Sequence, residues 1–473
     1  MALFSQWVDK VDGWVWGWVL IVLILAVGVL LTARSGFVQV RHLGKALKFM
    51  VKNEEGAAGE VSSFGALCTA LSATIGTGNI VGVATAICLG GPGALLWMEI
   101  AAFFGMATKY AEGLLAVKFR EDKGDGHFLG GPFYYIEKGM GKNWKWLAKL
   151  FALFGTLAGL LGIGTITQVN GITSAVQNFF DPDMSHIAFS IGTNSYSWAT
   201  VIGSIVVAFC VALVVIGGIK RIAKVSEVVV PFMAITYVVF ALIILFTHIT
   251  AIPAAVVLVC KSAFVPKAAL GAAAGITLKI AMQKGIGRGI FSNESGLGSA
   301  PIAAAAAQTN EPVRQGLVSM TGTFIDTIII CTMTGLSIIL TGAQDLFQEG
   351  SFEGANITSA AWKNGLPWNP AVSEFILMLC LAFFAFTTIL GWDYYSERCL
   401  EYLSGGNKVL LTVFRYLYIL AVLIGPFLTV SVVWGIADVF NGLMAFPNLV
   451  ALFALSGVVA KETKRYLGKN QLQ

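Results

Sequence analysis

Apolar runs of about 20 residues recur from one end of the chain to the other, and a helix of that length crosses the hydrocarbon core of a bilayer. Hydrophobic residues make up 56% of the chain and charged residues only 12%, which is typical of membrane proteins. The runs are continuous and too long for the alternating strands of an outer-membrane barrel. We predict an all-α integral membrane protein with about eleven transmembrane helices, at residues 14–33, 64–90, 92–117, 147–178, 198–217, 227–249, 268–284, 313–341, 371–391, 409–431 and 445–460.

The distribution of Lys and Arg predicts the orientation, because short cytoplasmic loops carry the excess of positive charge. The loops after the first and third runs are rich in these residues, whereas loops 179–196 and 342–370 are poor in them. An odd number of spans then places the N-terminus outside and the C-terminus in the cytoplasm. We expect a multi-pass protein of the plasma (inner) membrane. The net charge of +5 follows from this topology and indicates no nucleic-acid partner.

Motifs for enzymatic chemistry are weak. The glycines of 285–289 follow no strand and lie in no βαβ unit, which argues against a dinucleotide loop. The seven cysteines are scattered without a CxxC pair, and the four histidines are not paired at metal spacing. We therefore expect neither an enzyme nor a bound cofactor.

The second apolar run contains the stretch LSATIGTGNIVG, residues 71–82, in which glycines, hydroxyls and an amide interrupt a helix. Broken helices persist in a bilayer only where protein or a cavity surrounds them, and transporters use such breaks to bind ions and substrates. The alternative is a close-packed helix crossing, which the four-residue spacing of Gly78 and Gly82 would suit. Thr, Gly and Asn in succession cost helix stability that packing does not require, so we favour a binding site.

Transporters built from two inverted repeats carry a second interruption in the corresponding position. The seventh run supplies a candidate with Gly271, Gly275 and Thr277. This topology predicts three segments: an extra N-terminal helix and loop at 1–60, a first five-helix repeat at 61–250, and a second five-helix repeat with a cytoplasmic tail at 251–473.

Five ordered motifs then identify a family: GTGNIVGVATAICLGGPGALLWM, GGPFYYIEKGMG, RGIFSNESGLGSAPIAAAA, FAFTTILGWDYYSER and ADVFNGLMAFPNL. Together they resemble the alanine or glycine:cation symporter family, the sodium:alanine symporters, from about residue 60 to the C-terminus. The resemblance implies a LeuT-type fold, with one helix added to the five-plus-five core. It also implies sodium-coupled uptake of small neutral amino acids, in particular alanine and glycine. We expect a monomer in the lipid bilayer.

The resemblance also implies a substrate site. Gly78-Asn79 matches the glycine-asparagine pair in the broken first core helix of LeuT-type transporters. Substrate contacts are expected from Thr74, Thr77, Gly78, Asn79, Gln168, Gly275, Ile276, Thr277 and Trp392. For Gln168 the alternative is a hydrogen bond between helices. Trp392 either limits the size of the substrate side chain or anchors the chain at the membrane interface.

A sodium site is implied by Thr387 and Thr388, which match a pair of hydroxyl ligands in the eighth core helix. Carbonyl groups near Ser72 and Ile75 would complete it. The alternative is that the two threonines only fill packing positions.

Charged residues inside apolar runs are expensive and usually face the protein interior; here they are Glu99, Lys109, Glu112, Lys279 and Asp326. Lys109 and Glu112 have the spacing of a mutual pair, and Asp326 is a candidate gate residue. Asn293, Glu294 and Ser295 belong to a family motif on the inner side, for which we expect an intracellular gate.

Two other transport classes compete with a sodium symporter. A channel would show rings of repeated ligands or a wet pathway, which the chain lacks. A proton-coupled amino acid transporter or exchanger would need a titrating carboxylate at the site, and residues 71–82 contain none.

Overall fold

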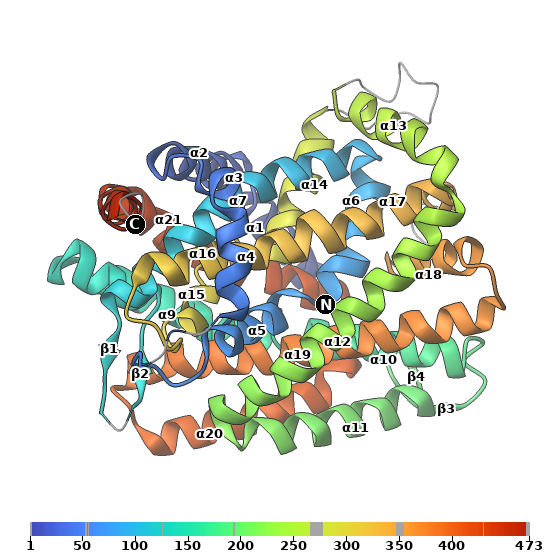
Figure 1. Ribbon diagram of the computed structural model, residues 1–473. Coiled ribbons are helices and arrows are strands. Elements are labelled where there is room, and N and C mark those ends of the chain that lie inside the picture. Colours follow the sequence, from blue (N-terminus) through green and yellow to red (C-terminus); the bar gives the residue numbers. More distant parts are fainter. Residues whose placement is uncertain are drawn as a thin grey trace.

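The computed structural model describes residues 2–52, 54, 56–124, 126–192, 194–264, 278–346, 354–428 and 430–469, which are mostly helical (Figure 1). The strands of the described residues form two short antiparallel hairpins. They are β1 (Glu121–Asp122) with β2 (Phe128–Leu129), and β3 (Ile187–Ile191) with β4 (Asn194–Ser197). The hairpins lie at opposite ends of the molecule (Figure 1). The predicted all-α class is confirmed.

The helices are α1 (Ala2–Val15), α2 (Trp18–Arg34), α3 (Val38–Arg41), α4 (Leu43–Val51), α5 (Ser63–Thr74), η1 (Gly78–Gly82), α6 (Val83–Gly90), α7 (Gly93–Phe119), α8 (Pro132–Tyr134), η2 (Tyr135–Met140), η3 (Lys142–Trp144), α9 (Lys145–Leu161), α10 (Ile166–Phe180), α11 (Trp198–Val215), α12 (Gly218–Thr247), η4 (Ile249–Ala251), α13 (Ile252–Phe264), α14 (Leu278–Asn293), α15 (Ala300–Ala304), α16 (Pro312–Thr323), η6 (Phe324–Cys331), α17 (Thr332–Leu340), η7 (Ala343–Leu346), α18 (Gly354–Gly365), α19 (Pro370–Ser404), α20 (Lys408–Ile424), η8 (Gly425–Phe427) and α21 (Val430–Lys469).

Nine helical segments of the described chain are long and apolar enough to cross a membrane: 6–34, 93–119, 142–180, 198–215, 218–247, 312–340, 370–404, 408–427 and 438–468. A bent pair, Ser63–Thr74 with Gly78–Gly90, makes up to ten. Most of the seventh predicted run, 268–284, lies outside the described residues. The chain is thus a multi-pass membrane protein, and the count of eleven spans stays a prediction.

Helices from distant parts of the sequence meet around α5. This helix packs against α12, α15 and α19, while α7 packs along both α14 and α16. The contacts join helices on either side of the predicted boundary between residues 250 and 251. The division into two five-helix repeats stays a prediction.

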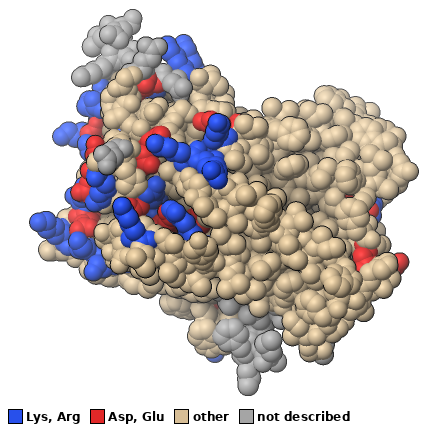
Figure 2. Space-filling view, turned by 90° about the horizontal axis from the view of Figure 1, so that it is seen from below, with Lys and Arg blue, Asp and Glu red and all other residues tan. Residues whose placement is uncertain are grey.

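The outer surface matches a lipid environment. Large apolar side chains are exposed along α11, α12 and α20, among them Ile205, Phe209, Phe232, Val409 and Leu417. Exposed apolar surface of this extent marks contact with a membrane or a partner. Figure 2 shows Lys and Arg gathered at one end of the molecule, with mostly uncharged side chains over the rest of the face in view.

The predicted extra helix is closely packed against the other spans. It comprises α1 and α2, and α2 lies against α7 and α21. A Cβ on Gly28 would lie only 2.9 Å from the Cβ of Phe104, and the indole of Trp16 donates a 2.8 Å hydrogen bond to the carbonyl oxygen of Asp438.

Candidate binding site at two helix breaks

The interruption predicted within residues 71–82 is present. The α5 helix ends at Thr74, and Ile75 has an extended backbone with φ −76° and ψ 95°. The chain resumes as the π-helical turn η1 and continues into α6, bent by 51° from α5. The backbone groups released by this break are buried, so they must find partners within the protein.

Neutral side chains satisfy those backbone groups. The amide N–H of Gly76 donates to Asn79 Oδ1 at 2.9 Å, and that of Thr77 donates to Gln168 Oε1 at 3.3 Å. Gln168, on α10, also donates from Nε2 to the carbonyl of Ile163 at 3.0 Å. The structure therefore brings Asn79 and Gln168 to the same break, where Gln168 makes the hydrogen bond between helices that was its alternative role.

The two threonines differ in their surroundings. The hydroxyl of Thr74 turns back along α5 and donates to the carbonyls of Ala70 and Leu71 at 2.8 and 3.3 Å. The hydroxyl of Thr77 is buried and has no hydrogen-bond partner among the residues that the structure describes. Thr77 thus offers a free polar group at the break.

Two of the predicted sodium ligands, Thr388 and Ile75, are in contact at the break. The hydroxyl of Thr388 lies 3.3 Å from the carbonyl oxygen of Ile75 and 3.0 Å from that of Phe384. The hydroxyl of Thr387 also reaches the carbonyl of Phe384, at 3.0 Å. The side chain of Ser72 instead donates to the carbonyl of Thr69 at 2.7 Å, which leaves only its carbonyl as a ligand for an ion.

Gly76 allows these groups to approach each other. A Cβ at this position would lie 2.5 Å from Thr388 Oγ1 and 3.2 Å from Gln168 Oε1. No side chain larger than hydrogen fits there without displacing one of the two.

A second helix break lies beside the first. The α14 helix ends at Asn293 and α15 begins at Ala300, and the residues between them include Glu294 at φ 56°, Gly296 at φ 91° and Gly298 at φ 84°. The two interrupted helices touch, because a Cβ on Gly78 would lie 3.2 Å from the Cα of Ser292.

This second break lies at the motif for which an intracellular gate is expected, and the interruption predicted at Gly271, Gly275 and Thr277 stays a prediction. Those three residues and Ile276 lie outside the described residues, so the substrate contacts predicted for Gly275, Ile276 and Thr277 stay predictions. The positive φ angles favour Gly296 and Gly298 here, and the alternation of glycine with polar residues was the available signal for the break.

Sequence reasoning missed one link at the first break. The side chain of Asp326, in the π-helical segment η6, accepts a 2.7 Å hydrogen bond from Asn79 Nδ2 through Oδ1. Its other oxygen accepts from the hydroxyls of Ser292 and Thr327 at 3.0 and 2.8 Å. A carboxylate therefore touches both broken helices, and residues 71–82 alone could not reveal it.

Trp392 is fully buried on α19, which rules out the interfacial anchor. A Cβ added to Gly164 would lie 2.6 Å from the Cβ of Trp392. The ring of Trp392 meets that of Tyr395 edge to face, with centroids 5.6 Å apart. The indole N–H faces the carboxylate of Glu294 without reaching hydrogen-bonding geometry. Trp392 thus adjoins the second break.

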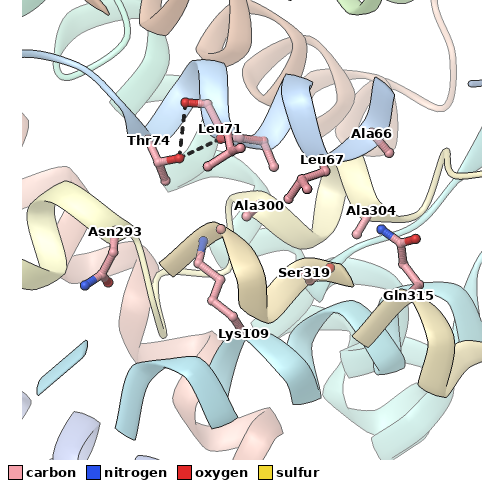
Figure 3. Close-up of a pocket in the computed structure, with 12 residues that line it drawn as sticks. Ala66, Leu67, Leu71, Thr74, Lys109, Asn293, Ala300, Ala304, Gln315 and Ser319 are labelled. Carbon is pink, nitrogen blue, oxygen red and sulfur yellow. Dashed lines mark hydrogen bonds between the residues drawn. The ribbon is translucent and has the colours of Figure 1, made fainter. Parts of the chain in front are cut away.

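A small cavity lies between α5 and the neighbouring helices α7, α15 and α16 (Figure 3). Its lining includes Thr74 on α5, Lys109 on α7, Ala300 on α15 and Gln315 on α16, and its volume of about 20 Å³ holds one water molecule. In Figure 3 the side chain of Lys109 extends from α7 with its ammonium toward Thr74 and Ala300. The predicted pair of Lys109 with Glu112 is not an ion pair in this structure; the contacts of Glu112 are with Gly296 and Asn448.

A buried break in a membrane helix, lined by polar groups and in contact with a second interrupted helix, is typical of a LeuT-type transporter. The crystal structure of MhsT in complex with L-phenylalanine has this fold: it aligns with a TM-score of 0.56 and 14% sequence identity, over 86% of this chain and 99% of that one. The whole chain, residues 1–473, also matches the family model of the sodium:alanine symporters. The chain belongs to the sodium:alanine symporter family.

Two relatives are similar over nearly their whole length. An uncharacterized transporter of Haemophilus influenzae is 53% identical over 458 residues, which cover 97% of this chain and 95% of the relative. The sodium/alanine symporter AgcS of Methanococcus maripaludis is 44% identical over 467 residues, which cover 98% and 97%. Family membership makes the chain a transporter rather than an enzyme, with sodium as the co-transported ion.

Proposed function

We propose that this chain is a symporter that uses the sodium gradient to import alanine and glycine across the plasma membrane by alternating access. The main support is the first break, where buried amides and carbonyls meet the hydroxyl of Thr388 and the side chain of Gln168. Neutral groups of this kind suit a zwitterion, whose buried charges must both be satisfied.

The substrate contacts in this proposal come from Thr74, Thr77, Gly78, Asn79, Gln168 and Trp392, together with Gly275, Ile276 and Thr277. The free hydroxyl of Thr77 supports this placement. Trp392 is a bulky wall that would exclude leucine and phenylalanine by steric overlap.

The sodium site is formed by Thr387 and Thr388 with the carbonyls of Ser72 and Ile75. The short distances among Thr388, Ile75 and Phe384 support it, because these are hard oxygen ligands close together in a buried place. The carbonyl of Phe384 is a further candidate ligand.

The available driving force is sufficient for accumulation. One sodium ion that moves down about 100 mV supplies roughly 2.3 kcal/mol, and a tenfold sodium gradient adds about 1.4 kcal/mol. At one-to-one coupling the sum supports an accumulation of several hundredfold. Rocking of one group of helices against another around the breaks would alternate the access, with the N-terminus outside and the C-terminus in the cytoplasm.

Uptake of labelled alanine and glycine into proteoliposomes tests this function, with sodium, lithium or proton gradients imposed separately. We expect uptake to require sodium, and labelled leucine should not accumulate. Alanine uptake that is indifferent to sodium would overturn the proposal.

One observation favours proton coupling as a second candidate. The carboxylate of Asp326 is hydrogen-bonded to Asn79, so a group that can titrate does lie at the first break. Under this alternative a proton gradient alone would drive alanine uptake in the same vesicles.

A further inference from the structure

Two buried carboxylates adjoin the second break, and each has only one oxygen hydrogen-bonded. Glu294 Oε2 accepts from the hydroxyl of Ser299 at 2.7 Å. Glu112 Oε1 accepts from the amide of Gly296 at 3.1 Å and from Asn448 Nδ2 at 2.7 Å. Glu294 Oε1 and Glu112 Oε2 are buried and lack a partner in the described ranges. We refer to Glu112 and Glu294 as the acid pair.

Hydrogen-bond donors surround the acid pair without satisfying it. The indole N–H of Trp392 faces Glu294, and Tyr395, whose ring contacts that of Trp392, interacts electrostatically with both carboxylates. The indole N–H and the Tyr395 hydroxyl are buried and unpaired with any described residue. The four unpaired atoms are two acceptors, Glu294 Oε1 and Glu112 Oε2, and two donors, the indole N–H of Trp392 and the hydroxyl of Tyr395. Since a buried polar atom without a partner is costly, the hydrogen bonding of this cluster depends on whether one of the carboxyls carries a proton.

The charges around the acid pair are unequal. Lys109 on α7 acts on both carboxylates and on Asp326 of η6. The other titratable groups that act on the pair are Asp326, Tyr395 on α19 and Tyr135 on η2. Both carboxylate oxygens of Asp326 are hydrogen-bonded, unlike those of the acid pair. The acid pair and Lys109 would together carry one net negative charge if all three were ionised, and burial of an uncompensated charge is strongly unfavourable.

One proton on the acid pair removes this charge and gives one of the two carboxyls an O–H that can donate a hydrogen bond. Two nearby carboxylates commonly share a proton in this way. A bound metal cation is a less suitable way than a proton to neutralise the acid pair, because Lys109 already supplies a positive charge to both carboxylates.

The acid pair is tied directly to the backbone of the break. Gly296 donates its amide to Glu112, and its carbonyl accepts from Asn448 Nδ2 at 2.9 Å. Glu294 itself has a positive φ of 56°, which a residue with a side chain rarely adopts. A change in the charge of the pair therefore acts on the part of the second interrupted helix that lies beside Trp392.

We propose that Glu112 and Glu294 share one exchangeable proton, with Lys109 as its counter-charge, and that transport requires the pair to hold this proton. This inference rests on the proposed function of the chain and adds a proton-binding site to it. The proton makes sodium-driven uptake depend on pH, whether or not it crosses the membrane.

The test is the pH profile of sodium-driven alanine uptake in proteoliposomes between about pH 5 and about pH 9. We expect wild-type uptake to fall at alkaline pH, with a limiting slope of about tenfold per pH unit for one proton. Glu294→Gln and Glu112→Gln imitate the protonated carboxyl, so each should flatten the profile and keep uptake at alkaline pH. A purely structural role would not produce this retention.

Asp393→Asn is the matched control, because Asp393 is a buried carboxylate of α19 with one unpaired oxygen in the described structure, adjacent to Trp392 in sequence. It should keep the wild-type pH profile. Lys109→Met should move the alkaline fall upward by about one pH unit or more, since loss of a nearby positive charge strengthens proton binding to carboxylates.

A direct measurement covers variants that transport poorly. Alanine binding to purified protein in weakly buffered detergent solution should change the bulk pH when followed with a pH indicator, and Glu294→Gln should abolish that change. Profiles of both Gln variants that match the wild type, a wild-type profile without pH dependence, or a control that flattens equally would overturn the proposal. Sodium dependence at one fixed pH judges the proposed symport separately.

Discussion

The two helix breaks lie against each other, yet they carry opposite chemistry. The first, at Ile75 to Thr77, is neutral, and its amides are paired with Asn79 and Gln168. The second, at 294–299, contains an acidic residue at positive φ, with unpaired carboxylate oxygens near it in the described structure. The first can therefore bind a zwitterion through neutral groups, with the carboxylate of Asp326 hydrogen-bonded to Asn79, whereas the second has carboxylates at the break itself.

Asp326 connects the two breaks, because it bonds Asn79 on one side and Ser292 on the other. Substrate at the first break and charge at the second therefore share one residue. We infer that the two sites are coupled through Asp326, and the predictions below separate their contributions.

The largest expected effect comes from filling the first break. Gly76→Ala places a methyl group 2.5 Å from Thr388 Oγ1 and 3.2 Å from Gln168 Oε1, so the sodium and substrate groups must separate. Overpacking of this kind costs up to about 3 kcal/mol, and we expect alanine uptake efficiency to fall roughly a hundredfold. Initial uptake rates at saturating sodium measure the loss.

Gly82→Ala is the matched control for that prediction. Gly82 lies in the same η1 segment, has a helical φ of −64°, and has nothing within 4 Å of its added Cβ. It should keep near-normal uptake. Equal losses in the two variants would show that a methyl group is harmful anywhere in this segment. The loss in Gly76→Ala would then not come from overlap with Thr388 and Gln168.

The second prediction concerns sodium. Replacement of both Thr387 and Thr388 by Ala removes two hydroxyls, each a hydrogen-bonding group with a net value of about 1 to 1.5 kcal/mol. Apparent sodium affinity should fall roughly fiftyfold, with the fold retained. Sodium activation curves of alanine uptake measure it.

The single variants sharpen this assignment. Only the Thr388 hydroxyl reaches the carbonyl of Ile75, while that of Thr387 also lies 3.5 Å from the sulfur of Met233. Thr388→Ala should therefore account for most of the loss. Unchanged sodium dependence in the double variant would show that the site is elsewhere.

The third prediction concerns the neutral partners of the first break. Asn79→Ala and Gln168→Ala should each weaken alanine binding by about 1 to 3 kcal/mol, the cost of an unsatisfied buried polar group. Calorimetric titration of the purified variants with alanine measures this. Wild-type affinity in both would refute the placement of the substrate.

The first break could be predicted from the sequence because its cause is local: Thr, Gly and Asn in succession at 77–79 disfavour a helix wherever they lie. The hydroxyl pair and Gln168 are also expected at the site, through the family resemblance. The pairing of Asn79 with Asp326 joins positions 247 residues apart, and nothing in FIDTIIIC indicates that its π-helical turn faces another helix break.

The break at 294–299 was not predicted, for a physical reason. Hydropathy indicates an apolar run at 268–284, and the break predicted inside that run lies outside the described residues. The described interruption follows it, where Glu294, Gly296 and Gly298 adopt positive φ. A polar motif inside a membrane helix looks like a loop when only apolar length is counted, so burial of Glu294 required the tertiary structure.

The smallest expected effect lies outside both breaks, in the hairpin of β1 and β2 that follows α7. His127 lies between two carboxylates, with Nε2 2.9 Å from Glu401 and Nδ1 3.2 Å from Glu60. The hydrogen bonds with Glu401 and then Glu60 outweigh burial and raise the pKa of His127 to about 9. Burial alone would raise the pKa of Glu60, but the hydrogen bond from His127 and the charge of Arg398 lower it overall.

Because the folded pKa of His127 exceeds its unfolded value of about 6.5, the stabilisation by its positive charge is fully present below about pH 6.5 and is lost as the pH rises through about 9. His127→Gln should therefore lower the stability of the purified protein by about 1 kcal/mol at acidic and neutral pH, discounted for partial exposure, and by little above pH 9. Thermal unfolding in detergent across this range measures the difference.

His248→Gln is the control, since the ring nitrogen of His248 lies 3.0 Å from the carbonyl oxygen of Ile244 rather than from a carboxylate. A stability difference that stays constant from acidic to alkaline pH would mean that His127 acts through packing and not through its charge. Alanine uptake measured on the same variant would then show whether this ionic contact, next to the chain that leads into α5, also influences the first break.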